Sequence, residues 1–151
     1  MKSIKEPVSG ALRLECDQAL INLLSAASRC NLEIREMLRG FQVTSQQFNV
    51  LRILQGQYPA AATISLLKQK MIDKMSDISR IIDRLLQKKF VVRQPGHADR
   101  RTVDIKINET GLALLEKIDR AVSLSSFISE RLSLDEAKTL NRLLAKLHTT
   151  A

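Results

Sequence analysis

Residues 96–111 read GHADRRTVDIKINETG and combine a glycine, two adjacent arginines and an alternating run. From Val103 to Ile107 apolar residues alternate with polar ones, as they do along a strand that has one buried face. The residues FVVR at positions 90–93 also have the composition of a strand, and residues 94–101 are expected to form the loop between the two. The pattern predicts one short β-hairpin that carries its arginines at the bend.

The N-terminal part of the chain has the pattern of a long amphipathic helix. Between residues 11 and 39 no proline or glycine interrupts the sequence, and apolar residues recur at alternating spacings of four and three. This heptad series consists of Cys16, Leu20, Leu23, Ala27, Cys30, Ile34 and Met37. Further apolar residues widen the stripe beyond what one neighbouring helix needs, so we expect this helix to contact both its own core and a partner subunit.

Three further helices are expected next, and capping residues mark the starts of two of them. Thr44 and Gln47 form a capping box for a second helix, and a short third helix is expected over residues 63–69. Asp73 has the position of an N-cap for a fourth helix that runs to about Lys89. Three or four residues then separate the third and fourth helices, which is the spacing of a helix-turn-helix.

Two closing helices complete the expected fold. Asn108 is placed to cap a long helix that continues to about Arg131, and Ser133 with Glu136 forms a capping box for the last helix. A chain of 151 residues fits one domain with a sizeable core. The expected fold class is therefore mainly α, with about six helices and one small β-hairpin.

Positive charge is concentrated in the middle of the chain. The net charge is +8, and residues 63–106 hold eleven Lys or Arg against five Asp, whereas residues 11–40 and 107–151 are each neutral. A basic surface attracts polyanions such as nucleic acid or anionic membrane. Because a merely solvated face would not segregate its charge in this way, we expect a polyanion site within residues 63–106.

Composition restricts the class and location of the protein. No apolar run is long enough to cross a bilayer, and the N-terminal residues lack the apolar core of a signal peptide. Cys16 and Cys30 are too far apart along one helix for an intrachain disulfide, although a bridge to a second subunit stays open. We therefore expect a cytoplasmic protein without membrane contact, whose cysteines are buried as small hydrophobic residues.

The helix expected after Asp73 presents a polar face suited to DNA. At 100° per residue its isoleucines fall on one side, while Ser76, Arg80 and Arg84 fall on the other. Arginine can bind guanine through two hydrogen bonds, serine can bond base edges, and lysine suits phosphates. The residues expected to contact DNA from this part of the chain are Lys74, Met75, Ser76, Ser79, Arg80 and Arg84.

The predicted hairpin adds a second candidate contact with DNA. Arg100 and Arg101 lie at its bend, where an arginine can enter a narrow minor groove of enhanced negative potential. Asp99 beside them lowers the net attraction, so we expect it to accept hydrogen bonds from a neighbouring arginine and fix its direction.

From about Met71 to Gly111 the chain resembles the winged helix-turn-helix core of the MarR family of bacterial transcriptional regulators. The segment IDKMSDISRIIDRLLQKKFVVR is similar to that family's recognition helix and following strand, and DRRTVDIKINETG is similar to its wing. The wing of the family is commonly an Asp-x-Arg, then a strand, then Leu-Thr and a glycine two residues later. Asp99, Arg101 and Gly111 match these positions, whereas Ile-Asn replaces Leu-Thr and Met75 stands where a polar residue is common.

The resemblance implies an architecture and a function. Residues 11–40 and 108–148 would be dimerisation helices, and residues 44–107 would form the winged helix-turn-helix DNA-binding domain. A homodimer would place each recognition helix in a major groove and each wing along a minor groove of a pseudo-palindromic operator in double-stranded DNA. The expected role is that of a repressor, which a small hydrophobic or aromatic effector could relieve.

Two other functions stay open. Members of the family also respond to oxidants through a cysteine of the first helix, which makes Cys16 and Cys30 candidate redox residues. The reactive position of the peroxide-sensing branch falls at Ile21, and its usual tyrosine partners are missing here. The same scaffold could also serve as an adaptor or antirepressor that binds protein, with the basic hairpin merely solvated.

Catalytic and metal sites have no support in the sequence. The chain has no phosphate-cradling glycine motif and no convincing nucleophile with a base. His97 and His148 are not spaced as ligands of a shared ion. We expect no enzymatic activity, no cofactor and no metal.

Overall fold

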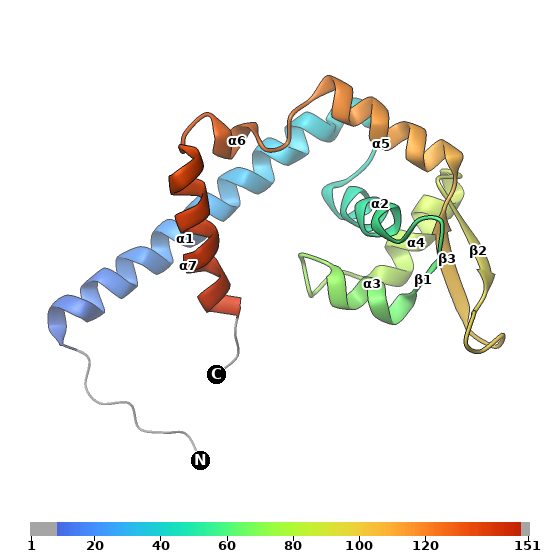
Figure 1. The fold of residues 1–151 in the computed structure, drawn as a ribbon, viewed down its shortest axis with the longest axis horizontal. Helices are drawn as coiled ribbons and strands as arrows, with labels where there is room; N and C mark the ends of the chain where they lie inside the picture. Colours follow the sequence, from blue (N-terminus) through green and yellow to red (C-terminus); the bar gives the residue numbers. More distant parts are fainter. Residues whose placement is uncertain (1–8, 149–151) are drawn as a thin grey trace, which may run out of the picture.

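The computed structural model describes residues 9–148 (Figure 1). A long helix, α1 (Gly10–Leu38), runs from one end of the molecule to a lobe at the other end, where the short 3-10 helix η1 (Arg39–Phe41) follows it. The helix α5 (Glu109–Ala121) leads the chain back from that lobe, and α6 (Ser126–Ser129) and α7 (Leu134–His148) follow (Figure 1). Within the described residues no helix is both long and apolar enough to span a membrane.

The lobe, which we call the winged lobe, consists of three helices and a small sheet. Its helices are α2 (Ser45–Gln57), α3 (Ile64–Lys70) and α4 (Ile78–Gln87). Its antiparallel sheet has the strand order β1-β3-β2 and is built from β1 (Ala62–Thr63), β2 (Val91–Pro95) and β3 (Val103–Ile107). The pairing of β2 with β3 confirms the predicted hairpin. The two-residue strand β1 was not predicted, because so short a segment has no alternating pattern of its own.

The hydrophobic core lies in the winged lobe and under the first turns of α5. Its fully buried side chains include Leu38, Val50, Leu51, Leu54, Leu67, Met71, Ile82, Leu85, Ile105, Ile107, Leu115 and Ile118. The predicted isoleucine side of the fourth helix points into this core, as do Ile105 and Ile107 of the hairpin. The sheet and the helices thereby fix one another's positions. Val103, which was expected on the same buried face, is 44% exposed.

Three of the four predicted helix caps, those at Thr44, Asn108 and Ser133, are present in the structure. Thr44 and Gln47 form the complete capping box of α2, and the Asn108 side chain accepts a hydrogen bond from Gly111 N at the start of α5. The Ser133 amide donates to Glu136 Oε2 at 2.8 Å, and the Glu136 amide donates to Ser133 Oγ at 3.2 Å. Hydrogen bonds to the Glu136 carboxylate from the Ser133 backbone, and then from the Ser133 side chain, hold the pKa of Glu136 below its usual value.

The predicted start of the fourth helix was wrong. The helix α4 begins at Ile78 with Asp77 as its N-cap, whose side chain accepts a hydrogen bond from Arg80 N. Residues 71–77 form an irregular turn, longer than the three or four residues expected. Asp73 does cap a backbone amide, but it is that of Met75 two residues later, so its carboxylate closes a tight local turn and not a helix.

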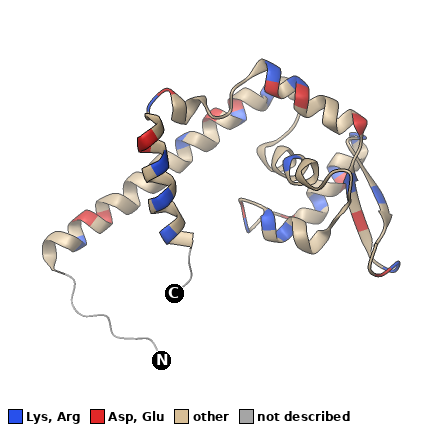
Figure 2. Ribbon diagram, in the orientation of Figure 1, with Lys and Arg blue, Asp and Glu red and all other residues tan. Residues whose placement is uncertain are grey.

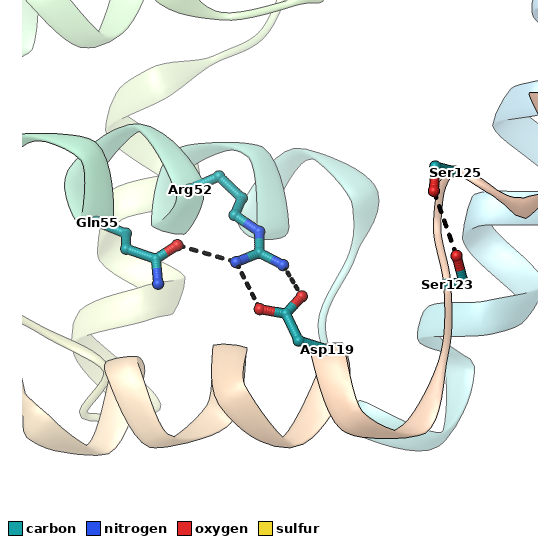
Figure 3. Close-up of polar contacts among 5 residues, drawn as sticks. All are labelled: Arg52, Gln55, Asp119, Ser123 and Ser125. Carbon is teal, nitrogen blue, oxygen red and sulfur yellow. Dashed lines mark hydrogen bonds and ion pairs between the residues drawn. The ribbon is translucent and has the colours of Figure 1, made fainter. Parts of the chain in front are cut away.

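The predicted length of the helix after Asn108 was also wrong. α5 ends at Ala121, because Val122 is extended, with φ −138° and ψ 147°. Around it β-branched and serine residues favour non-helical conformations, and the hydroxyls of Ser123 and Ser125 are hydrogen bonded to each other at 3.3 Å (Figure 3). The short helix α6 follows before the capping box of α7.

The apolar stripe of α1 is largely uncovered in the single chain. Leu38 is the buried residue of α1, whereas Leu20, Ile21 and Leu24 are all more than half exposed. Cys16 is exposed and Cys30 is partly exposed, so the expectation of buried cysteines was wrong for the chain by itself. The reason is that most of α1 extends away from the core of the winged lobe (Figure 1).

Candidate nucleic-acid interface

The helix α4 has one buried face and one exposed polar face. Ile78, Ile81, Ile82 and Leu85 are buried against the lobe. Ser79, Arg80 and Arg84 are exposed on the other side. Because the buried face anchors the helix along its whole length, the exposed side chains are presented on a rigid support.

The turn before α4 is held by its own hydrogen bonds and by α2. Asp73 Oδ1 accepts from Met75 N at 2.9 Å, and the Asp73 carbonyl accepts from Ser76 N at 3.2 Å. Gln46 Nε2 donates to Asp73 Oδ2 at 3.3 Å, which ties the turn to the first turn of α2. Lys74 Nζ donates to the Gln69 carbonyl at the end of α3. Lys74, Met75 and Ser76 thus lie in an ordered turn, not in the recognition helix where they were expected.

The tip of the hairpin is a compact loop in which glycine is needed for space. Gly96 N donates to the Thr102 carbonyl at 2.9 Å, and Thr102 N donates to the Asp99 carbonyl at 3.0 Å. A Cβ atom at Gly96 would lie 2.0 Å from Thr102 Oγ1 and 2.4 Å from the Asp99 carbonyl oxygen. The close approach of the two sides of the loop therefore excludes a side chain at this position.

Asp99 contacts the arginine that it was expected to orient, through the main chain. Its Oδ1 atom accepts from Arg101 N at 2.9 Å. This bond sets the backbone direction at Arg101 and leaves the guanidinium group free of Asp99. Arg100 and Arg101 are both exposed at the tip of the loop.

A second aspartate, Asp104, accepts a hydrogen bond from the backbone of the loop, and the sequence did not indicate this role. Asp104 in β3 is only 5% exposed, its Oδ2 accepts from His97 N at 3.2 Å, and its Oδ1 has no hydrogen-bond partner. Its place among the polar positions of the alternating strand indicated an exposed residue. No local signal reveals its burial, because Asp104 lies on the central strand of the sheet, paired with Thr63 of β1 and Gln94 of β2.

Two of the basic residues near α4 have internal partners. Lys88 Nζ donates to the Gln42 carbonyl and to Gln47 Oε1, the latter at 2.9 Å. Arg93 of β2 forms an ion pair with Asp83 of α4 at 2.6 Å, which joins the hairpin to the helix. Further basic residues of the lobe include positions on α3, on α4 and at the hairpin tip (Figure 2).

No group of three or more potential ligands is arranged to hold a metal ion anywhere in residues 9–148. The surface of α4 and the hairpin tip offers hydrogen-bond donors, positive charge and a few exposed apolar groups. Such groups suit phosphates and base edges.

Similarity to known proteins identifies the family of the chain. The model of the MarR family matches residues 43–103, which include α2, α3, α4 and most of the hairpin. The multiple antibiotic resistance protein MarR of Escherichia coli K12 is 31% identical over 116 residues, covering 76% of this chain and 79% of MarR. The chain belongs to the MarR family.

Other members of the MarR family agree with the fold. An uncharacterized HTH-type transcriptional regulator of Bacillus anthracis is 30% identical over 130 residues, which are 85% of each chain. A mutant of Escherichia coli MarR complexed with operator DNA has a TM-score of 0.75 at 28% identity, covering 87% of this chain and 93% of that one. Apo wild-type MarR gives a TM-score of 0.68 at 27% identity, covering 95% and 100%.

Proposed function

We propose that this protein is a transcriptional regulator that binds double-stranded DNA in a sequence-specific manner as a homodimer. The observation that carries the proposal is that α4 and the hairpin tip present exposed arginines from one compact lobe. The MarR relative of the same fold was solved in complex with operator DNA, which supports this surface as the DNA-binding one.

The exposed residues divide into base-reading and phosphate-binding groups. Ser76, Ser79, Arg80 and Arg84 would face base edges in the major groove, and Arg100 and Arg101 would follow the minor groove. Lys74 donates one of its three N–H groups to the Gln69 carbonyl, and its other two could bind a phosphate. Asp99 would act on the wing through the Arg101 backbone.

The uncovered apolar surface of the long helices supports a homodimer. Leu20 and Leu24 of α1 are 56% and 62% exposed, and Leu143 and Leu147 of α7 are 47% and 68% exposed. Apolar stripes of this kind are covered by a partner in stable proteins. A twofold axis through these helices would place the two winged lobes on half-sites of a pseudo-palindromic operator, about one helical turn apart.

The regulatory role follows from the family. We propose that the protein acts as a repressor in the bacterial cytoplasm, without catalysing a reaction, and that a small hydrophobic or aromatic effector relieves repression. Several relatives are named HTH-type transcriptional regulators, which supports a binding function and not an enzymatic one.

The test is selection of genomic fragments with the purified full chain, followed by titration of the selected DNA at several salt concentrations. We expect affinity to fall steeply as salt rises, because each neutralised phosphate releases counterions. The variants Arg80→Ala and Arg101→Ala should each lower affinity by roughly tenfold, as expected for loss of one charge-assisted contact. Lys117→Ala, which removes one exposed charge from α5, is the matched control and should bind normally.

Absence of binding to every fragment at low salt would contradict the proposal. That outcome, with a folded dimer confirmed by circular dichroism and sedimentation, would favour a protein-binding adaptor on the same scaffold.

A further inference from the structure

Two exposed apolar side chains stand at the entrance to α4. Met75 is 92% exposed and Ile72 is 84% exposed, the highest values among the large hydrophobic residues exposed within residues 9–148. Both belong to the turn of residues 71–77, whose last residue is the N-cap of α4. They add nothing to the core of the lobe, so their presence needs another reason.

The exposure of these side chains is imposed by an ordered backbone. Ile72 N donates to Asn49 Oδ1 of α2 at 2.9 Å, and Met75 N donates to Asp73 Oδ1, also at 2.9 Å. The amide of Ile72 is thereby bonded to α2, and that of Met75 to Asp73, whose other carboxylate oxygen accepts from Gln46 of α2. Because the turn already holds the two apolar groups outward, little conformational entropy is lost when a ligand binds them.

The charges around the turn select the kind of partner. Lys70, Lys74 and Arg80 are exposed near it, whereas the acids of the turn are already engaged, since Asp73 accepts from Met75 N and Asp77 accepts from Arg80 N. The three cations outnumber the two acids, which favours a polyanion that also offers an apolar group. In the major groove of B-DNA the 5-methyl group of thymine is the apolar group at the base edges.

The position of the turn relative to the recognition helix agrees with this partner. Recognition helices contact base edges mainly with their N-terminal residues. Met75 lies three positions before Ile78, the first residue of α4. A helix whose N-terminus enters the major groove brings such a residue to the base edges.

We propose that Met75 and Ile72 are specificity-determining residues that bind thymine 5-methyl groups in each operator half-site. This inference rests on the proposed DNA-binding function of the lobe. It predicts that the operator carries thymine at one or two positions beside those read by Arg80.

The test replaces each thymine of the selected operator, one at a time, by deoxyuridine, which lacks the methyl group and keeps every hydrogen-bonding atom. Binding of the full-length dimer is measured by fluorescence anisotropy at one salt concentration. In the wild-type protein one or two replacements should weaken binding roughly three- to fivefold, as expected when a methyl group no longer leaves water. In Met75→Ala or Ile72→Ala that sensitivity should disappear at the matching position, and in Met75→Leu it should persist.

The outcomes separate this inference from the function on which it rests. Binding of the unmodified operator with no effect of any replacement, or with sensitivity unchanged in both alanine variants, would overturn the thymine contact and leave the DNA-binding function intact. Loss of binding to the unmodified operator by every protein tested would instead count against the function itself.

Discussion

Arg52 of α2 forms a two-pronged ion pair with Asp119 near the end of α5 (Figure 3). The guanidinium also donates to Gln55 Oε1 at 2.9 Å and lies 4.9 Å from the centre of the Phe48 ring. This arrangement joins the winged lobe to the helix that leads away from it. It therefore contributes to the angle at which the proposed dimerisation helices leave the lobe.

The Arg52–Asp119 pair should show energetic coupling. We expect Arg52→Ala and Asp119→Ala each to lower the free energy of unfolding by about 1 kcal/mol, because the pair is only partly shielded from water. The double variant should cost less than the sum of the two, by about 0.5 kcal/mol or more, since each single change already removes the bond. Urea unfolding of all four proteins measures this coupling, and strict additivity would show that the pair contributes nothing.

Gly96→Ala should damage the wing without unfolding the lobe. The added Cβ would collide with the Asp99 carbonyl oxygen, a backbone atom that cannot rotate away. We expect DNA affinity to drop roughly tenfold, the size of one lost charge-assisted contact, with the midpoint of thermal unfolding little changed. Gly56→Ala in α2, where no atom lies within 4 Å of the new Cβ, is the matched control. A Gly96→Ala protein that binds DNA normally would mean that the loop does not position the arginines.

Gly111→Ala should destabilise the whole protein. Its Cβ would lie 2.4 Å from the Phe90 carbonyl oxygen and 2.7 Å from Ile107 Cγ1, where α5 packs on the strand ends. We expect a loss of about 2 kcal/mol, as for other overpacked core positions. The same Gly56→Ala control should instead gain up to about 1 kcal/mol, because alanine favours the helix over glycine. Calorimetry of the two variants gives the comparison, and equal midpoints would contradict the packing argument.

Asp104 should be more important for the order of the wing than for the stability of the lobe. Asp104→Asn keeps an acceptor for His97 N and removes a buried charge that has one unpartnered oxygen. We expect the free energy of unfolding of this variant to be about 1 kcal/mol higher than that of the wild type. Asp104→Val, which removes the acceptor, should speed hydrogen exchange at the His97 amide by roughly tenfold, given the usual worth of one hydrogen bond. Unchanged exchange at that amide would show that the bond does not restrain the loop.

The capping box of α7 should make the free energy of unfolding depend on pH. The hydrogen bonds from Ser133 lower the pKa of Glu136 in the folded state, so its stabilising effect is present above the usual pKa range of glutamate. That effect is lost as the pH falls through the folded-state pKa. NMR titration should show Glu136 ionising below the usual pKa range of glutamate. In Glu136→Gln the acid-induced loss of stability should be smaller, and an identical pH profile would contradict the role of the carboxylate.

The sequence by itself determined the features that depend on neighbours a few residues apart. The capping boxes at Thr44 and Ser133 and the cap at Asn108 involve atoms within three residues of one another, so local sequence specifies them. The alternation from Val103 to Ile107 likewise predicted a strand with one buried face. These local signals were enough to place the hairpin and to recognise the family.

Only the tertiary structure decided the details that depend on residues far apart in the chain. The turn before α4 is fixed by two hydrogen bonds to α2, one from Gln46 to Asp73 and one from Ile72 N to Asn49. Asp104 is buried on the central strand, between Thr63 of β1 and Gln94 of β2, and it bonds the backbone of His97 in the loop. The physical reason is that a side chain's solvent exposure and its bonding partners are set by which segments pack together, and a periodic pattern records only the face on which a residue lies.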